Sequence, residues 1–232
     1  MSIAYVNGGK SGGLVNTNSA TTGTFNVSAA GLLVAWIRWA DIGGQSISTV
    51  SDLAGSTWHL GTKSAQIGSN SFIQPAYAYN IAGFTNNTVT ITLTGASVAL
   101  LAVADQFSGF ASTNPFNQEI NTWSTSGGTI TATSFSTAQP SSLVYVALAA
   151  ESVASSWSWS SAGGGATYSA AQGNPGGNGA AGASFYNIYA TTQAGITPAF
   201  VQSSGAAGGL VAIEFDVSAV FPNLRTLMGV GT

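Results

Sequence analysis

The sequence predicts an all-β fold, a large antiparallel β-sandwich of the jelly-roll kind, built from two pseudo-repeated halves and followed by a C-terminal tail. Short runs of β-branched and aromatic residues recur along the 232 residues, separated by turns rich in Gly, Ser, Asn and Pro. Patterns with the 3.6-residue period of a helix are nearly missing. Several segments of the first part of the chain recur about 110 residues later.

The expected strands follow from alternation and composition. The clearest is 87–94 (NTVTITLT), where Val89, Ile91 and Leu93 alternate with threonines, as in a strand with one buried and one solvated face. Segment 31–39 is apolar on both faces until Arg38, which indicates a central strand covered on both sides or one whose outer face meets a partner. The other expected strands are 3–7, 24–27, 58–67, 72–81, 98–107, 117–123, 130–135, 143–150, 157–160, 184–189, 198–202 and 210–217. So many strands exceed an immunoglobulin-like domain and favour a larger jelly-roll sandwich.

The repeat is expected to span about 23–109 and 133–217. Leu33 and Val34 recur as Leu143 and Val144, 110 residues later. The segment SFIQPAYAYNIA is echoed by SFYNIYATTQAG at a displacement of 113 residues, and VADQF (103–107) by VAIEF at a displacement of 108. This drift is what loop insertions on a common scaffold produce. A single domain over 1–217 is favoured over two tandem domains of about 85 residues, because the intervening segment is not a Pro- or charge-rich linker.

Two segments stand apart from the strand pattern. The passage 163–182, with GGG, NPGG and NGAAG, is expected to be a long loop with several positive-φ glycines. The tail 218–232 mixes apolar residues with little polarity, so it should fold back on its domain or dock onto a partner. The residues expected to make a docking contact are Phe221, Leu224, Arg225, Leu227 and Met228.

The composition limits the partners. Four Lys or Arg and seven Asp or Glu make up 5% of the residues, where roughly 25% is usual. A surface of Ser, Thr, Asn, Gln and Gly favours permanent packing against a neighbour, because little side-chain entropy or charge solvation is lost there. The few basic residues and the net charge of −3 argue against nucleic acid. No apolar run reaches the ~18 residues of a membrane helix, so no membrane contact is expected.

Cysteine is absent, and the N-terminal MSIAYVNGGKSGG does not have the pattern of a secretory signal. The composition nevertheless resembles that of an extracellular protein. Release by cell lysis reconciles these two facts, and a removed signal is the alternative.

The candidate chemical groups argue against an enzyme. The single histidine, His59, has no cysteine or second histidine with which to bind zinc, so no metal or other cofactor is expected. Glu214 and Asp216 share one face of a strand, roughly 7 Å apart, which glycoside hydrolysis permits. A polar position just outside the core is the simpler interpretation of that pair. Asp105, matched by Ile213 in the repeat, should lie at the rim of the sheet or be hydrogen-bonded.

Trp157 and Trp159 are the candidates for glycan contact. They lie in SSWSWSS, on the same face of an expected strand and flanked by serines. Exposed aromatic rings of this kind stack on sugars, and packing in a core or a subunit interface is the alternative.

Three segments carry a resemblance to known proteins: STVSDLAGSTWHL (48–60), ADQFSG (104–109) and STNPFNQ (112–118). The chain resembles the Gly-, Ser- and Thr-rich, lectin-like β-sandwich domains of bacteriophage virion proteins (capsid decoration, head-fibre or tail) and of bacterial surface proteins. Ser56 stands where that family usually has Asn, and Gln106 where it has Glu. The resemblance implies a lectin-like or jelly-roll sandwich and carries over no catalytic residue.

The expected function is therefore non-enzymatic. We expect a structural protein of the phage virion surface, a capsid decoration or cement protein or a head-fibre protein, with the major capsid protein or other virion proteins as partners. A homo-oligomer is expected, with a trimer as the working hypothesis. The alternative is a glycan-binding module of a phage tail or of a secreted or bacterial cell-surface protein, with a cell-surface glycan as its partner.

Overall fold

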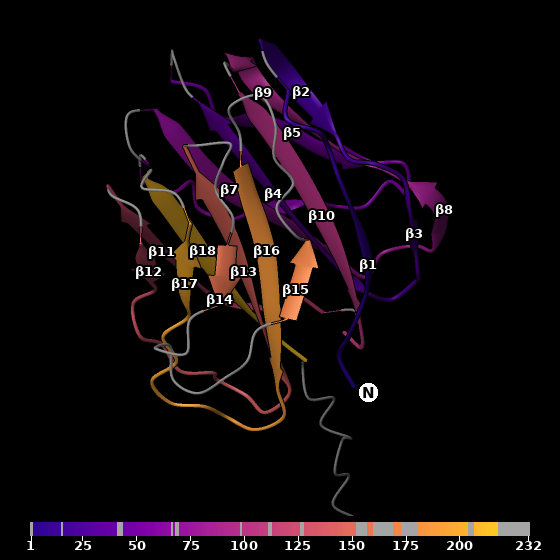
Figure 1. Cartoon of the computed structure of the whole chain (residues 1–232). Helices are drawn as coiled ribbons and strands as arrows, with labels where there is room; N and C mark the ends of the chain where they lie inside the picture. Colours follow the sequence, from indigo (N-terminus) through magenta and orange to yellow (C-terminus); the bar gives the residue numbers. More distant parts are fainter. Residues whose placement is uncertain are drawn as a thin grey trace, which may run out of the picture.

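The computed structural model describes residues 2–14, 16–40, 44–65, 67, 70–97, 99–110, 113–125, 128–151, 157–159, 169–172, 181–203 and 207–217. Within these residues the chain forms 18 β-strands and no helix, and the strand pairs are antiparallel (Figure 1). The expected all-β class is confirmed.

The N-terminal half is a jelly roll. Its strands are β1 (Ala4–Lys10), β2 (Thr17–Thr21), β3 (Phe25–Val27), β4 (Leu32–Ala40), β5 (Ile47–Asp52), β6 (His59–Leu60), β7 (Ser71–Tyr79), β8 (Phe84–Asn87), β9 (Val89–Ser97) and β10 (Leu100–Ser108). One sheet has the order β1-β10-β4-β7-β6, and a smaller sheet, β2-β9-β5, covers one of its faces, with the β3-β8 pair beside it. The first strand pairs with the last and the connections cross from sheet to sheet, as in jelly rolls.

The C-terminal half repeats this order. Its strands are β11 (Phe116–Ser124), β12 (Thr129–Thr131), β13 (Ser142–Ala150), β14 (Trp157–Trp159), β15 (Ser169–Gln172), β16 (Ala181–Tyr189), β17 (Ala199–Gln202) and β18 (Gly208–Asp216). They form the sheets β11-β18-β13-β16-β15 and β12-β17-β14. Both sheets repeat the order of the N-terminal half, and only the β3-β8 pair has no counterpart among the named strands, where the second half has an isolated bridge between Phe135 and Ile196. The repeat detected in the sequence is therefore one of topology.

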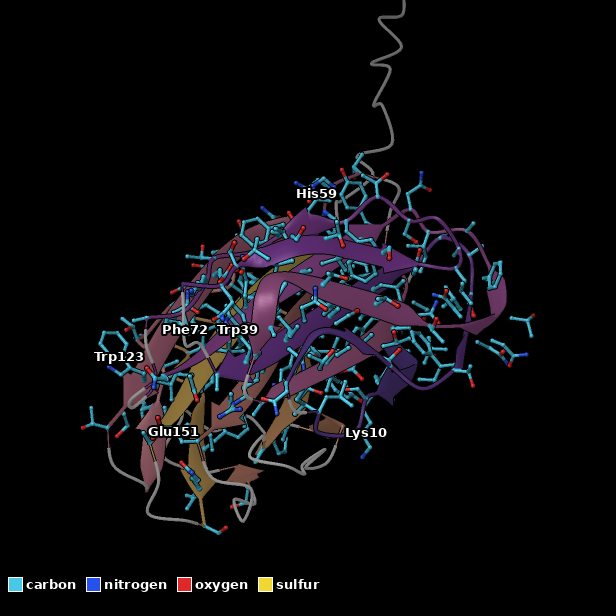
Figure 2. All side chains as sticks on the ribbon, turned by 90° about the horizontal axis from the view of Figure 1, so that it is seen from above. Lys10, Trp39, His59, Phe72, Trp123 and Glu151 are labelled. Carbon is cyan, nitrogen blue, oxygen red and sulfur yellow. The ribbon has the colours of Figure 1, made fainter. Side chains whose placement is uncertain are left out.

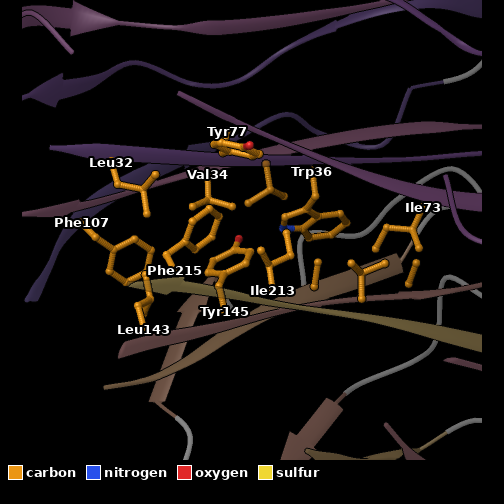
Figure 3. Close-up of a cluster of buried hydrophobic side chains, with 14 of the residues drawn as sticks. Leu32, Val34, Trp36, Ile73, Tyr77, Phe107, Leu143, Tyr145, Ile213 and Phe215 are labelled. Carbon is orange, nitrogen blue, oxygen red and sulfur yellow. The ribbon is translucent and has the colours of Figure 1, made fainter. Parts of the chain in front are cut away.

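The two halves are joined face to face through their five-stranded sheets. Each half has its own core between its larger and smaller sheet, around Leu33 and Ile91 in the first and Val144 and Phe200 in the second. A third and larger cluster lies between the two five-stranded sheets (Figure 3). Its members from the first half include Leu32, Val34, Trp36, Val103 and Phe107, and those from the second include Leu143, Tyr145, Val211, Ile213 and Phe215. The junction between the halves is therefore a hydrophobic core and not a hinge.

The predicted displacement between equivalent residues of the two repeats is correct for one pair of strands and wrong for two. β10 and β18 match at 108 residues, because Val103 and Val211 both face the inter-half core. β4 and β13 match at 111 and not at 110: Leu32 and Leu143 face that core, whereas Leu33 and Val144 face the separate cores. Side chains alternate along a strand, so an alignment that is off by one residue exchanges the two faces.

The β7 segment needs a different displacement from the expected 113. Given the pairing of β4 with β7 and of β13 with β16, Tyr79 corresponds to Ile188, a displacement of 109. The shared letters SF at 71 and 184 therefore do not mark equivalent positions. Residue identity was misleading here because it ignores the hydrogen-bonded register.

Some expected strands differ from those observed. Of segment 58–67, only His59–Leu60 is a strand, and β2, β5, β8 and β15 were not expected. β2 consists of Thr, Asn, Ser and Ala, and only the pairing of its backbone with β9 identifies it. The Gly-rich passage 163–182 was expected to be loop throughout, but it holds β15 and the first two residues of β16.

Candidate functional site

The residues singled out for function lie mostly outside the part of the chain that is described. Trp157 and Trp159 lie in β14, where they pair with Gln202 and Phe200 of β17. The structure describes only the backbone of these two residues. The docking residues Phe221, Leu224, Arg225, Leu227 and Met228 are all in 218–232, which is also outside the described residues. The sites discussed below are therefore ones that the structure itself brings together.

Asp105 lies at the centre of the junction between the halves, not at a rim. Its side chain is fully buried. Its Oδ2 accepts hydrogen bonds from the hydroxyl of Tyr145 at 2.5 Å and from that of Ser184 at 2.8 Å, both from the other half. Tyr5 donates to Oδ1 at 3.5 Å. Burial and the Asp105 carboxylate raise the pKa of Tyr145 well above its ordinary value, so this hydroxyl keeps its proton and acts as a donor.

A second carboxylate ties the halves at their edge. Glu119, on β11, accepts from the backbone N–H of Thr62 at 3.0 and 3.2 Å. Burial raises its pKa above the ordinary value, although the hydrogen bonds from Thr62 and Asn121 oppose that shift. Both Asp105 and Glu119 therefore join the two halves.

Glu214 is structural in the same way as its counterpart Gln106. Gln106 holds the connection before β4, since its Oε1 accepts from Ser28 N at 3.2 Å and its Nε2 donates to Ser28 O at 2.8 Å. Glu214 Oε1 accepts from Ala138 N at 2.9 Å, in the matching connection. Its Oε2 accepts from Asn117 at 2.7 Å and Gln118 at 2.5 Å. A fully buried carboxylate with these partners has no oxygen turned toward a substrate.

Asp216 lies beside Glu214, and its pKa is unusually high. Its Oδ1 accepts from Ser142 Oγ at 2.7 Å. Partial burial raises its pKa to about 6, the Ser142 hydrogen bond opposes that shift, and the negative charge of Glu214 adds to it. The contact of Asp216 with Ser142 is therefore structural, and Asp216 binds its proton more tightly than an exposed Asp does.

Because the folded pKa of Asp216 lies above its unfolded value of 3.8, its protonation favours the folded state. Its contribution is fully present below about pH 4 and is lost as the pH rises through about 6. We expect the Asp216→Asn variant to show a weaker pH dependence than the natural chain between pH 7 and 4. Urea midpoints at four pH values measure this, and parallel curves for the two proteins would refute it.

Arg38, on β4, is a buried cation at the junction between the two halves. Its Nη2 donates to Ser71 Oγ at 2.7 Å, while Nε and Nη1 make no hydrogen bond. Burial lowers its pKa to about 10, and the negative charge of Glu151 across the interface opposes that shift. A guanidinium with a pKa of about 10 stays charged at neutral pH.

The described surface also holds a pocket of about 410 Å³, at the edge of the N-terminal half. It is lined by Ala54, Gly55, Ser56, Thr57, His59, Tyr79, Asn80, Ile81 and Ala82. Its volume lies in the range of roughly 300–1,000 Å³ found for small-molecule sites. One wall is the loop after β5, another is the end of β7, and His59 on β6 lies between them.

The loop wall of this pocket is held by side chains beneath it. Asp52 accepts from the backbone N–H of Ser56 at 2.8 Å and from its hydroxyl at 2.7 Å. Buried Asn87 accepts from the N–H groups of Leu53 and Ala54 at 2.9 and 3.2 Å. Gly55 has a φ of +71°, which glycine adopts without strain. The loop shape is thus set before any ligand arrives.

Two other lining residues, His59 and Tyr79, belong to a row of stacked aromatic rings. The His59 ring stacks against Tyr79 with centroids 5.2 Å apart and planes 11° apart, and against Tyr77 at 5.2 Å and 21°. Tyr77 in turn stacks on Phe116 of the second half at 5.4 Å and 7°. These contacts fix the rings of His59 and Tyr79, which are both lining residues of the pocket, and Figure 2 shows His59 at the periphery of the molecule.

Sequence reasoning missed this pocket. From the sequence, His59 is weighed only as a zinc ligand and segment 48–60 only as part of a resemblance. The usable signal was the combination of that segment, Asp52 and Ser56 included, with Tyr77 and Tyr79 on one face of a strand. Only the pairing of β6 with β7 brings His59 to those tyrosines.

Comparisons with known proteins leave the chain without a family. No family model and no curated protein matches it. Among solved structures, a point mutant of the oxalate decarboxylase OxdC of Bacillus subtilis aligns with 9% identity over 93% of this chain and 75% of that chain, with a TM-score of 0.23. A similarity this weak carries no argument about either protein.

The described residues lack two further features. None of their segments is a helix long and apolar enough to cross a membrane. They contain no group of three or more His, Cys, Asp or Glu side chains placed to hold a metal ion.

Proposed function

We propose that this chain is a non-enzymatic structural protein of the bacteriophage virion surface, a capsid decoration or cement protein or a head-fibre protein. The observation that carries the proposal is the outer face of the β2-β9-β5 sheet. Its outward side chains are hydroxyls, and they pair across strands, Thr21 with Thr90 at 2.9 Å and Ser19 with Thr92 at 3.4 Å. A neutral face of short side chains suits permanent contact with a neighbouring subunit, because little side-chain entropy or charge solvation is lost.

Two further features support a structural role. The two jelly rolls share a continuous buried core, which makes a rigid block. Three carboxylates that acid–base catalysis could use accept hydrogen bonds inside the fold, namely Asp105, Glu119 and Glu214. The expected partners are the major capsid protein or other virion proteins, in a homo-oligomeric arrangement.

Mass spectrometry of purified particles from the lysate of the source tests this proposal. We expect the chain in a simple copy-number ratio to the major capsid protein. A few copies per particle would move the assignment to a fibre or tail part. Its absence from particles, together with a monodisperse monomer in solution, would refute the proposal.

The second candidate is a glycan-binding module. It was expected at Trp157 and Trp159, and the pocket beside His59 is an independent observation that favours it. Array binding that Trp157→Ala or Trp159→Ala abolishes would assign glycan recognition to β14 and not to the pocket.

A further inference from the structure

We propose that the pocket beside His59 binds a neutral pyranose sugar, with the ring of Tyr79 as its stacking platform. The proposal concerns a site that the virion role does not require. It rests on the lining of the pocket, on its rigidity and on a comparison between the two halves. Its failure would leave the structural role untouched, because the tests use different samples.

The lining defines the chemistry of the ligand. None of its nine residues is Asp, Glu, Lys or Arg, so no side chain there would pair with a phosphate or carboxylate as an arginine does. Thr57 and Asn80 supply a hydroxyl and an amide, which both donate and accept hydrogen bonds, and the Ser56 hydroxyl, which donates to Asp52, can still accept one. A ligand covered with hydroxyls is matched by this set, whereas a purely apolar ligand would leave these groups unpaired.

The aromatic residues of the lining suit the apolar face of a sugar ring. One face of a pyranose ring carries C–H groups, and these pack on an aromatic ring. Tyr79 is partly exposed and lines the pocket, and stacking against His59 holds its orientation. The loop that carries Ser56 is anchored by Asp52 and Asn87, so binding loses little conformational entropy.

The second half shows that the fold does not need these residues. Strand pairing places Ser169 at the position of His59 and Ile188 at that of Tyr79. The same jelly-roll order forms there without a His–Tyr stack. The pair in the N-terminal half is therefore an addition to the scaffold, as a binding site would be.

The experiment is an NMR titration of the full chain. The probes are the methyl glycosides of glucose, galactose, N-acetylglucosamine and rhamnose, with N-acetylneuraminic acid and inorganic phosphate as charged comparators. We expect at least one neutral glycoside to shift the backbone amides of 54–57 and 80–82 saturably, with a dissociation constant on the order of 1 mM. Saturation transfer to the C–H protons of the sugar should accompany the shifts.

Variants separate the stacking platform from the polar wall. Tyr79→Ala should weaken binding at least tenfold, and Tyr79→Phe, which keeps the ring, should retain most of the affinity. Thr57→Val and Asn80→Gly remove polar groups at little cost to the fold, since Thr57 is exposed and Asn80 has a φ of +53° that glycine accepts. Each should weaken binding several-fold.

The matched control is an aromatic residue far from the pocket. Trp123 on β11 is half exposed and lies well away from His59 in Figure 2, so Trp123→Ala should leave the titration unchanged. No saturable shift by any neutral glycoside up to about 50 mM would overturn the proposal. So would binding of the charged probes alone, or binding that survives Tyr79→Ala, Thr57→Val and Asn80→Gly.

Discussion

Replacing Asp105 with isoleucine, the residue at the matching position of the second half, is expected to lower the free energy of unfolding by about 3–5 kcal/mol. The substitution removes the acceptor of two buried hydroxyls, those of Tyr145 and Ser184, at the centre of the junction. Each buried donor left without a partner costs about 1–3 kcal/mol. Urea unfolding followed by tryptophan fluorescence measures the loss.

A triple variant separates this explanation from a simple packing defect. In Asp105→Ile with Tyr145→Phe and Ser184→Ala, the two buried donors are removed together with their acceptor, and only the partly exposed hydroxyl of Tyr5 loses its long contact with Oδ1. Such replacements are often neutral, and we expect the triple variant to regain most of the lost stability. If the triple variant is no more stable than Asp105→Ile alone, the hydrogen-bond explanation is wrong.

Gly182→Ala is expected to destabilise the protein by about 3 kcal/mol through overpacking of the same junction. A Cβ on Gly182, in β16, would lie 2.5 Å from the carbonyl oxygen of Leu148 and 2.5 Å from Cη2 of Trp36 on the other half. Trp36 is fully buried in the core between the halves, so its ring can move only by displacing other core side chains. Thermal and urea unfolding both report the loss.

Two comparisons make the Gly182 result specific. Gly12→Ala, where an added Cβ meets nothing within 4 Å, should change the unfolding free energy by no more than about 0.5 kcal/mol. Trp36→Phe removes the ring atoms that the new Cβ would meet, so Gly182→Ala should cost less in that background. The contact with Leu148 O persists there, which makes the rescue partial. Equal costs in both backgrounds would contradict an inter-half clash.

The fold class could be predicted because its causes are local. Alternation in 87–94 and the apolar run in β4 follow from burial on one or both faces of a strand, and the structure confirms both. The match of Val103 to Val211 could also be found, since those strands contain similar residues. β2 could not, because a strand of Thr, Asn, Ser and Ala has no apolar pattern of its own.

The sites depended on register and on contacts between distant segments. The carboxylate of Asp105 lies in a strand whose pattern indicates a core-facing position, yet its partners come from residues 40 and 79 positions later. The pocket needs β6 beside β7, and its loop needs Asn87 from β8. None of these proximities is visible in the sequence, since each arises from strand pairing between segments that are separated along the chain.

The sequence by itself determined an all-β chain of two matching halves with a nearly uncharged surface, because side-chain chemistry and period-two burial are local properties. Tertiary structure alone decided that each half is a jelly roll, that the halves join through their five-stranded sheets, and that His59 and Tyr79 line one pocket. The physical reason is strand register: a shift of one residue turns every side chain of a strand to the other face, and only hydrogen bonding to neighbouring strands sets it.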